Sequence, residues 1–189
     1  MHGVDEAILR NIADMRTAVL NKFMLDVSSL GSTTVAIIVM GSAFVVLWMA
    51  RNHLAAVRIL TATGGAIVWT EIAKRLFGRP RPAIVPYLTD FTGFSFPSGH
   101  TLTATATYAT LAAIACCYLA ERSRRSAVWL ICWIVVTAVA VSRVYLGVHY
   151  PTDVAGGVLF GIVWFYLVAF AFRRSAPTSS QNLRTSARD

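Results

Sequence analysis

The stretch DVAGGVLFGIVWFYLVAFAF, residues 153–172, decides the fold class of this protein. The aspartate at its start is its only charged residue. A helix of about 20 apolar residues crosses a hydrocarbon core of roughly 30 Å, so the stretch predicts a transmembrane helix. Hydrophobic residues make up 56% of the 189 residues and charged residues only 14%, which is typical of a membrane protein rather than a soluble domain.

Four further apolar runs have a similar length and occupy residues 33–50, 54–73, 101–120 and 126–145. We therefore expect an all-α fold, a polytopic transmembrane helical bundle with five spans. Residues 1–30 mix acidic and basic side chains with apolar ones, which predicts an amphipathic N-terminal helix on the membrane surface. A sixth span within residues 7–30 is the alternative, although it would bury several of those charges.

The net charge of +8 maps onto the connections between the runs, which argues against a nucleic-acid partner. By the positive-inside rule, three arginine-rich places are cytoplasmic: the connection flanked by Arg51 and Arg58, the connection with Arg122, Arg124 and Arg125, and the tail that begins with Arg173 and Arg174. The loops at 74–100 and 146–152 then lie on the other, periplasmic side of a bacterial inner membrane. We expect a transmembrane domain over residues 31–172 and a disordered cytoplasmic tail over residues 173–189.

The loop at 74–100 contains four prolines and three glycines, so a single helix cannot form there. A loop of this length is uncommon unless it is functional or disordered. Its apolar residues argue against disorder, and we expect a packed periplasmic cap over the outer end of the bundle. The aromatic side chains that could contact a substrate are Tyr87, Phe91, Phe94 and Phe96.

Three polar clusters lie at the predicted outer ends of spans: KRLFGRPRP at 74–82, PSGH at 97–100 and SRVYLGVHYPTD at 142–153. A bundle would bring them together. Their cations, Lys74, Arg81 and Arg143, suit phosphate, since arginine offers a planar fork of donors and lysine a point charge. The clusters lack the several oxygen ligands that a hard metal demands, so we expect neither a metal nor a cofactor.

Two of these clusters are predicted to begin helices. Pro97 is placed as a first helical residue, which would leave the amides of Ser98, Gly99 and His100 as unpaired donors for an anion. Gly99 would also let an oxygen approach the backbone. Pro151 can open the last span in the same way, with Asp153 in its first turn.

The two histidines of these clusters suit phosphoryl transfer. Asp153 lies four residues after His149, where it can accept the Nδ1 proton and leave Nε2 free as a nucleophile. His100 then fits as the acid that protonates the departing oxygen. We interpret Glu71 as structural, pairing along its helix with Lys74 or Arg75.

Together the clusters resemble the three signatures of the type 2 phosphatidic acid phosphatase superfamily: lysine, six residues, Arg-Pro; Pro-Ser-Gly-His; and Ser-Arg, five residues, His, three residues, Asp. The resemblance covers about residues 30–170. It implies a helical bundle with an outward-facing site. The catalytic residues that it implies are the nucleophile His149, its partner Asp153 and the general acid His100; the implied phosphate ligands are Lys74, Arg81, Ser98, Gly99 and Arg143. Arg79 lies outside the pattern and is a weaker candidate.

The resemblance implies a metal-independent integral membrane lipid phosphate phosphatase that works through a phosphohistidine. Its substrate would be undecaprenyl diphosphate, phosphatidic acid or phosphatidylglycerol phosphate, with the tail in the bilayer. A lipid phosphotransferase, for example onto lipid A, and a non-catalytic lipid-phosphate binder or transporter are the alternatives. The oligomeric state is not indicated by the sequence.

Overall fold

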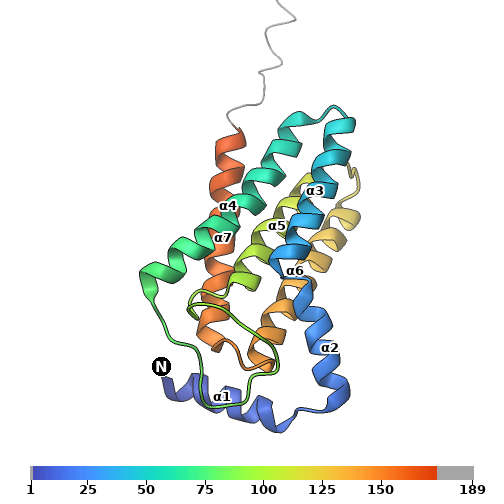
Figure 1. The fold of residues 1–189 in the computed structure, drawn as a ribbon. Coiled ribbons are helices and arrows are strands. Elements are labelled where there is room, and N and C mark those ends of the chain that lie inside the picture. Colours follow the sequence, from blue (N-terminus) through green and yellow to red (C-terminus); the bar gives the residue numbers. More distant parts are fainter. Residues whose placement is uncertain (1, 174–189) are drawn as a thin grey trace, which may run out of the picture.

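The structure is a computed structural model that describes residues 2–173, and within that range all regular secondary structure is helical (Figure 1). The helices are α1 (His2–Asp14), α2 (Ala18–Ser29), α3 (Thr33–Met49), α4 (His53–Phe77), α5 (Gly99–Cys117), α6 (Arg122–Tyr145) and α7 (Pro151–Arg173). The tail predicted for 173–189 lies, from residue 174 on, outside the described residues.

Each of the five predicted apolar runs is helical, in α3 to α7. In the described part of the chain, α6 and α7 are each long and apolar enough to cross a membrane, and α2 and α3 together qualify as one span bent by 45°. The helices α4 and α5 do not qualify in this way, and α5 has buried threonines along its length. The count of five spans therefore stays a prediction.

Helix α5 forms the centre of the bundle and packs against α3, α4, α6 and α7. Its inner positions are threonine and alanine, whose small side chains allow neighbouring helices to approach closely. The glycines of GVLFG in α7 meet α5 directly: a Cβ on Gly157 would lie 2.7 Å from the carbonyl oxygen of Ser98, and one on Gly161 would lie 2.6 Å from Cβ of Thr105. The motif therefore has the packing role expected of a GxxxG pattern.

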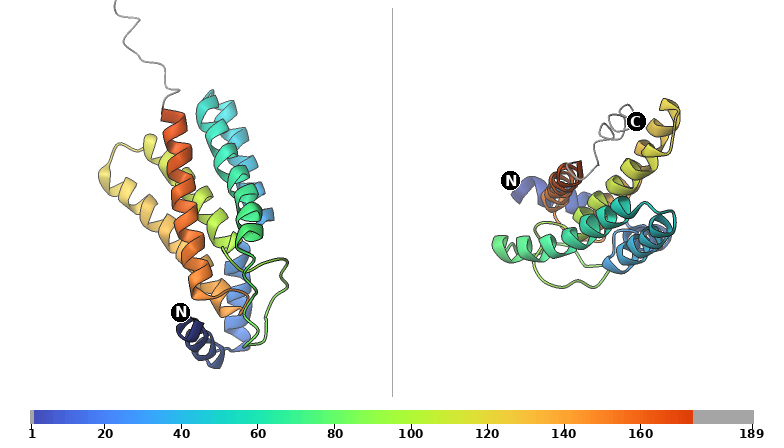
Figure 2. Two further views of the ribbon diagram at one scale, coloured as in Figure 1. Left: turned by 90° about the vertical axis from the view of Figure 1, so that its left-hand side faces the viewer. Right: turned by 90° about the horizontal axis from the view of Figure 1, so that it is seen from above.

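The N-terminal segment forms two helices where a single one was expected. Thr17 is extended and caps α2, because its Oγ1 accepts the Leu20 amide at 3.3 Å. In the break before it, Arg16 donates to the carbonyl oxygens of Tyr145 at 2.7 Å and Pro86 at 2.8 Å. Long-range contacts thus fix the break. Helix α1 lies across the lower end of the bundle, while α2 runs beside α6 (Figure 2).

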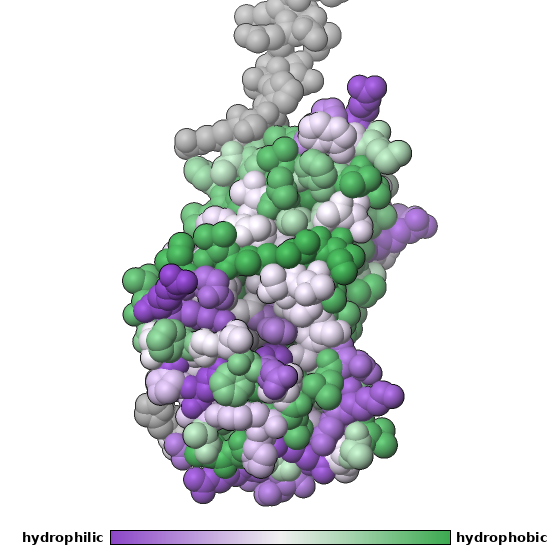
Figure 3. Space-filling model, viewed as in Figure 1, coloured by the Kyte–Doolittle hydropathy of each residue, from purple (hydrophilic) through white to green (hydrophobic). Residues whose placement is uncertain are grey.

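The connection between α4 and α5, residues 78–98, lies at the same end as α1 (Figures 1 and 2). It is tied to the bundle by the Leu88 amide, which donates to the Leu146 carbonyl oxygen at 3.0 Å. Hydrophilic residues gather over this end in the view of Figure 3, and a hydrophobic surface lies above them. This division suits a lower end at the membrane boundary.

Candidate active site

A cavity of about 280 Å³ opens beneath the bundle, between α3, α4, α5, the end of α6 and the connections that cover the lower end. It is lined by six of the eight residues expected at the site: Lys74, Arg81, Gly99, His100, Arg143 and His149. The three sequence clusters therefore meet around one space. Within residues 2–173, no three His, Cys, Asp or Glu side chains form a group that could hold a metal ion.

His149 lies in the connection just before α7 and is only 2% exposed. Its Nε2 is 3.3 Å from Nη1 of Arg81. A guanidinium can only donate, so Nε2 is the acceptor and the ring proton belongs on Nδ1. This tautomer is the one required for attack by Nε2.

The imidazole of His149 is electrically neutral at neutral pH. Burial lowers its pKa to about 4; the neighbouring carboxylate of Asp153 opposes this shift, and the positive charge of Arg81 adds to it. A neutral ring has a free lone pair and can act as a nucleophile without first losing a proton.

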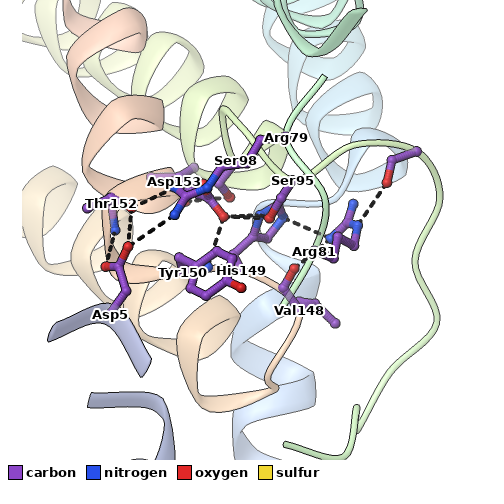
Figure 4. Close-up of polar contacts among 12 residues, drawn as sticks. Asp5, Arg79, Arg81, Ser95, Ser98, Val148, His149, Tyr150, Thr152 and Asp153 are labelled. Carbon is purple, nitrogen blue, oxygen red and sulfur yellow. Dashed lines mark hydrogen bonds and ion pairs between the residues drawn. The ribbon is translucent and has the colours of Figure 1, made fainter. Parts of the chain in front are cut away.

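Asp153, in the first turn of α7, is fully buried behind His149 and does not line the cavity. Its Oδ2 accepts the Ser95 hydroxyl at 2.5 Å and the Tyr150 amide at 2.9 Å, and lies 3.7 Å from Nδ1 of His149 (Figure 4). Ser95 Oγ is in turn 3.5 Å from that Nδ1. The expected histidine–aspartate pair is thus loose and is supported by Ser95, which no sequence pattern indicated.

Two cations of the cavity have partners on helices: Arg143 contacts α2, and Lys74 contacts a residue of its own helix α4. Arg143, in the last turn of α6, is 5% exposed and donates from Nη1 to Ser28 Oγ at 2.7 Å, while its buried Nε has no partner. Lys74 is on α4, not in the loop, and its Nζ is 3.6 Å from Oε1 of Glu71. The structural interpretation of Glu71 agrees with this pair. A buried unpaired donor beside two further cations is an arrangement that favours an anion.

Arg81 joins the α4–α5 connection to the loop of His149. Its Nε donates to the Gly93 carbonyl oxygen at 3.0 Å, and Nη2 to that of Thr92 at 2.9 Å. Its Nη1 donates to the Val148 carbonyl oxygen at 2.8 Å, next to the nucleophilic ring. Arg81 therefore holds three loop carbonyls in addition to facing the cavity.

The expectation for the start of α5 was partly wrong. The helix begins at Gly99 with Ser98 as N-cap, so Pro97 precedes the helix instead of opening it. The Ser98 amide donates to the Asp153 carbonyl oxygen at 3.0 Å, and its hydroxyl is 3.0 Å from Thr101 Oγ1, so Ser98 does not line the cavity. The start of α7 at Pro151 agrees with the prediction.

Gly99 does line the cavity, but it also has a packing role. A Cβ there would lie 2.8 Å from Cγ2 of Thr70, so the glycine allows α4 and α5 to come together beside Lys74.

Apolar helices and a cavity that combines three cations with two histidines suit a membrane-bound phosphatase. The chain belongs to the PAP2 superfamily, whose family model matches residues 55–176. This membership agrees with the resemblance carried by the three clusters.

The relatives include lipid phosphatases. Phosphatidylglycerophosphatase B of Bacillus subtilis (strain 168) is 30% identical over 172 residues, which cover 89% of this chain and 83% of that protein. Lipid A 1-phosphatase of Rhizobium johnstonii is 33% identical over 113 residues, or 55% of this chain and 42% of that protein.

Two solved structures have the same fold. The crystal structure of a transmembrane PAP2-type phosphatidylglycerolphosphate phosphatase from Bacillus subtilis has a TM-score of 0.86 and 29% identity, covering 94% of this chain and 88% of that one. The crystal structure of Aquifex aeolicus LpxE has a TM-score of 0.67 and 26% identity, and the match covers 86% of this chain and 93% of that one. The protein is therefore a membrane PAP2-type lipid phosphatase, a hydrolase of lipid phosphates.

Proposed function

We propose that this enzyme hydrolyses phosphatidylglycerol phosphate through a phosphohistidine at His149. The observation that carries the proposal is the buried neutral His149, whose Nε2 accepts from Arg81 beside a cavity that also contains His100. The similarity to phosphatidylglycerophosphatase B along 89% of the chain supports this choice of substrate.

In the first step, Nε2 of His149 attacks phosphorus, forming a P–N bond while the bond from phosphorus to the lipid oxygen breaks. A phosphate oxygen takes over the Arg81 donor that Nε2 accepts in the free enzyme. Lys74 and the unpaired Nε of Arg143 balance the remaining negative charge, which is largest in the transition state. Asp153 and Ser95 stabilise the positive charge on the ring through its Nδ1 side.

His100 moves the proton in both steps. It donates to the departing lipid oxygen in the first step and accepts a proton from water in the second, when water attacks the phosphohistidine and releases phosphate. A bound phosphate brings negative charge next to His100 and so favours its protonated form before the first step.

The lipid tail lies along α4 in this proposal. A groove on the outer face of α4 shares Ile67 and Glu71 with the cavity and continues along Val68 and Ile72. These last two side chains are exposed in the isolated chain, as expected for residues that contact acyl chains. A phosphate could then enter the cavity while its tail stays in the bilayer.

We further propose that the cavity faces the periplasm from the inner membrane. The connection with Arg51 and the end of α7 with Arg173 lie at the opposite end of the bundle from α1 (Figure 1). Arginine-rich ends are retained in the cytoplasm. A fluorescent protein fused after residue 189 should therefore fluoresce and a fused alkaline phosphatase should be inactive; the reverse pair of results would invert the topology.

A lipid A-type substrate is the second candidate, because lipid A 1-phosphatase is 33% identical over 113 residues. That match spans less than half of the relative, whereas the match to phosphatidylglycerophosphatase B spans most of both chains. The phosphotransferase reading has no observation that favours it over hydrolysis.

Purified enzyme in detergent tests the proposal against phosphatidylglycerol phosphate, phosphatidic acid, undecaprenyl diphosphate and lipid A. We expect the highest kcat/KM for phosphatidylglycerol phosphate, an unchanged rate with a metal chelator, and no phosphate release by His149→Ala. Full activity of His149→Ala would overturn the mechanism. Transfer of the phosphoryl group to an added lipid, without phosphate release, would overturn the assignment as a hydrolase.

A further inference from the structure

The carboxylate of Asp153 has a second cationic partner on the side away from His149. Nη1 of Arg79 lies 2.6 Å from Asp153 Oδ1 and 2.7 Å from Thr152 Oγ1 (Figure 4). The guanidinium also lies over the ring of Tyr150, with Cζ 4.4 Å from the ring centroid. The stacked ring and the bonded oxygens fix both the position and the plane of this cation.

Helix α1 supplies the other end of this contact. The side chain of Asp5 is 3% exposed, and its Oδ2 is 3.1 Å from Nη2 of Arg79. The same carboxylate accepts the Thr152 amide at 3.2 Å and the Thr152 hydroxyl at 2.6 Å. A buried aspartate at the start of an otherwise amphipathic helix is costly unless it is paired, and here its partners are Arg79 and the first turn of α7.

Arg79 therefore bridges two carboxylates that are 148 residues apart in the sequence, Asp5 and Asp153. By holding Oδ1 of Asp153, it turns Oδ2 toward Ser95 and His149. Because Oδ2 lies 3.7 Å from Nδ1, a small rotation of the carboxylate would break the contact altogether. The carboxylate beside the nucleophile is thus held by a cation that does not line the cavity.

We propose that Arg79 and Asp5 are positioning residues of the phosphatase site: α1 locks the carboxylate of Asp153 through Arg79 and so holds His149 for attack. This inference rests on the proposed function, in which His149 is the nucleophile. Arg79 and Asp5 touch neither the substrate nor the reacting atoms, and their effect is on the chemical step rather than on binding.

The test is a double-mutant cycle with Arg79→Gln and Asp5→Asn, measured as kcat and KM for phosphatidylglycerol phosphate in detergent. We expect Arg79→Gln to lower kcat about 100-fold with KM within about threefold. The loss of Arg79 displaces the Asp153 carboxylate and the His149 ring, but it removes no phosphate ligand. Asp5→Asn should lower kcat about 10-fold. The double variant should be no slower than Arg79→Gln alone, because Asp5 acts through Arg79.

Two further measurements separate positioning from folding. Guanidinium ion added at millimolar concentration should restore part of the kcat of Arg79→Ala, since the small cation can occupy the vacated space between two carboxylates. The matched controls are Lys22→Gln, which removes an exposed cation of α2, and Glu6→Gln, whose carboxylate pairs with Arg10 on the same helix. Both should keep the wild-type kcat.

An unchanged kcat in Arg79→Gln, or additive losses in the double variant, would overturn the inference. So would a loss of the same size in the two controls, which would indicate a general charge effect. If His149→Ala is inactive while Arg79→Gln has the wild-type rate, only this inference fails. If His149→Ala is fully active, the proposed function fails as well.

Discussion

Arg81 donates from Nη1 toward Nε2 of His149 across 3.3 Å, and from the same atom to the carbonyl oxygen of Val148 across 2.8 Å. The cation that is expected to bind phosphate therefore also marks which ring nitrogen is free of a proton. The same guanidinium holds the backbone of residues 92 and 93, so it couples the α4–α5 connection to the nucleophile.

Replacing Arg81 with lysine keeps the charge but removes this fork of donors. We expect Arg81→Lys to lower kcat/KM about 100-fold, because an ammonium cannot hold the three loop carbonyls and a phosphate oxygen together. Phosphate release from phosphatidylglycerol phosphate is the measurement, and Arg75→Lys, an exposed substitution on α4, is the control. Equal activity of the two variants would contradict the role given to Arg81.

The neutral state of His149 can be observed directly. Its pKa is lowered to about 4, chiefly by burial, so the ring is neutral above that value and gains a proton only in stronger acid. In enzyme with 13C-labelled histidine, the signal that is lost in His149→Gln should not shift between pH 8 and pH 5.5. A midpoint near the ordinary histidine value of about 6.5 would show that the ring is not desolvated as described.

Ser95 supports the pair formed by Asp153 and His149. Ser95→Ala removes the hydroxyl that bonds Asp153 Oδ2 and contacts Nδ1 of His149, and we expect kcat to fall about 10-fold with KM nearly unchanged. Ser29→Ala, on the exposed side of α2, should have no effect. A change confined to KM would mean that Ser95 acts on the substrate rather than on the nucleophile.

The close approach of α5 and α7 can be tested through stability. Gly161→Val would place its Cβ 2.6 Å from Thr105, and we expect a loss of about 1–3 kcal/mol in the free energy of unfolding in mixed micelles, as for other overpacked cores. Gly64→Val is the matched control, because no atom lies within 4 Å of its added Cβ. Equal losses of unfolding free energy in both variants would mean that the helix propensity of valine, and not the contact with α5, causes the destabilisation.

The helices and most of the expected site residues could be predicted from the sequence, since both depend on local patterns. Apolar runs predict helices by their length, and the three clusters contain six of the residues that line the cavity, including its two histidines and three of its cations. These features need no knowledge of which segments meet. The placement of Pro151 as the first residue of α7 followed from the fixed backbone angle of proline in the same way.

The rest depends on contacts between distant segments. The break between α1 and α2 is held by Arg16 and the carbonyl oxygens of Tyr145 and Pro86, which lie far away in the chain. Asp5 looked like one more charge on a surface helix, and only its burial against Arg79 gives it another role. The neighbouring sequence does not distinguish such a buried charge from a surface charge, because its role depends on a partner that is distant in the chain.

The start of α5 shows a limit of a different kind. Proline is common as a first helical residue, but the amide of Ser98 donates to the Asp153 carbonyl oxygen, and the helix starts one residue after it. A tertiary hydrogen bond therefore overrides a local preference. Whether Ser98 contacts bound phosphate, as the family resemblance implies, stays a prediction.

The most direct test of the account is capture of the phosphohistidine. Enzyme mixed with phosphatidylglycerol phosphate labelled in its terminal phosphate should be quenched in alkali within milliseconds and digested, since phosphohistidine is stable in base and labile in acid. We predict label on the peptide that contains His149 and none in His149→Ala. Phosphate release at the wild-type rate with no label on His149, or with label on another residue, would contradict the central claim.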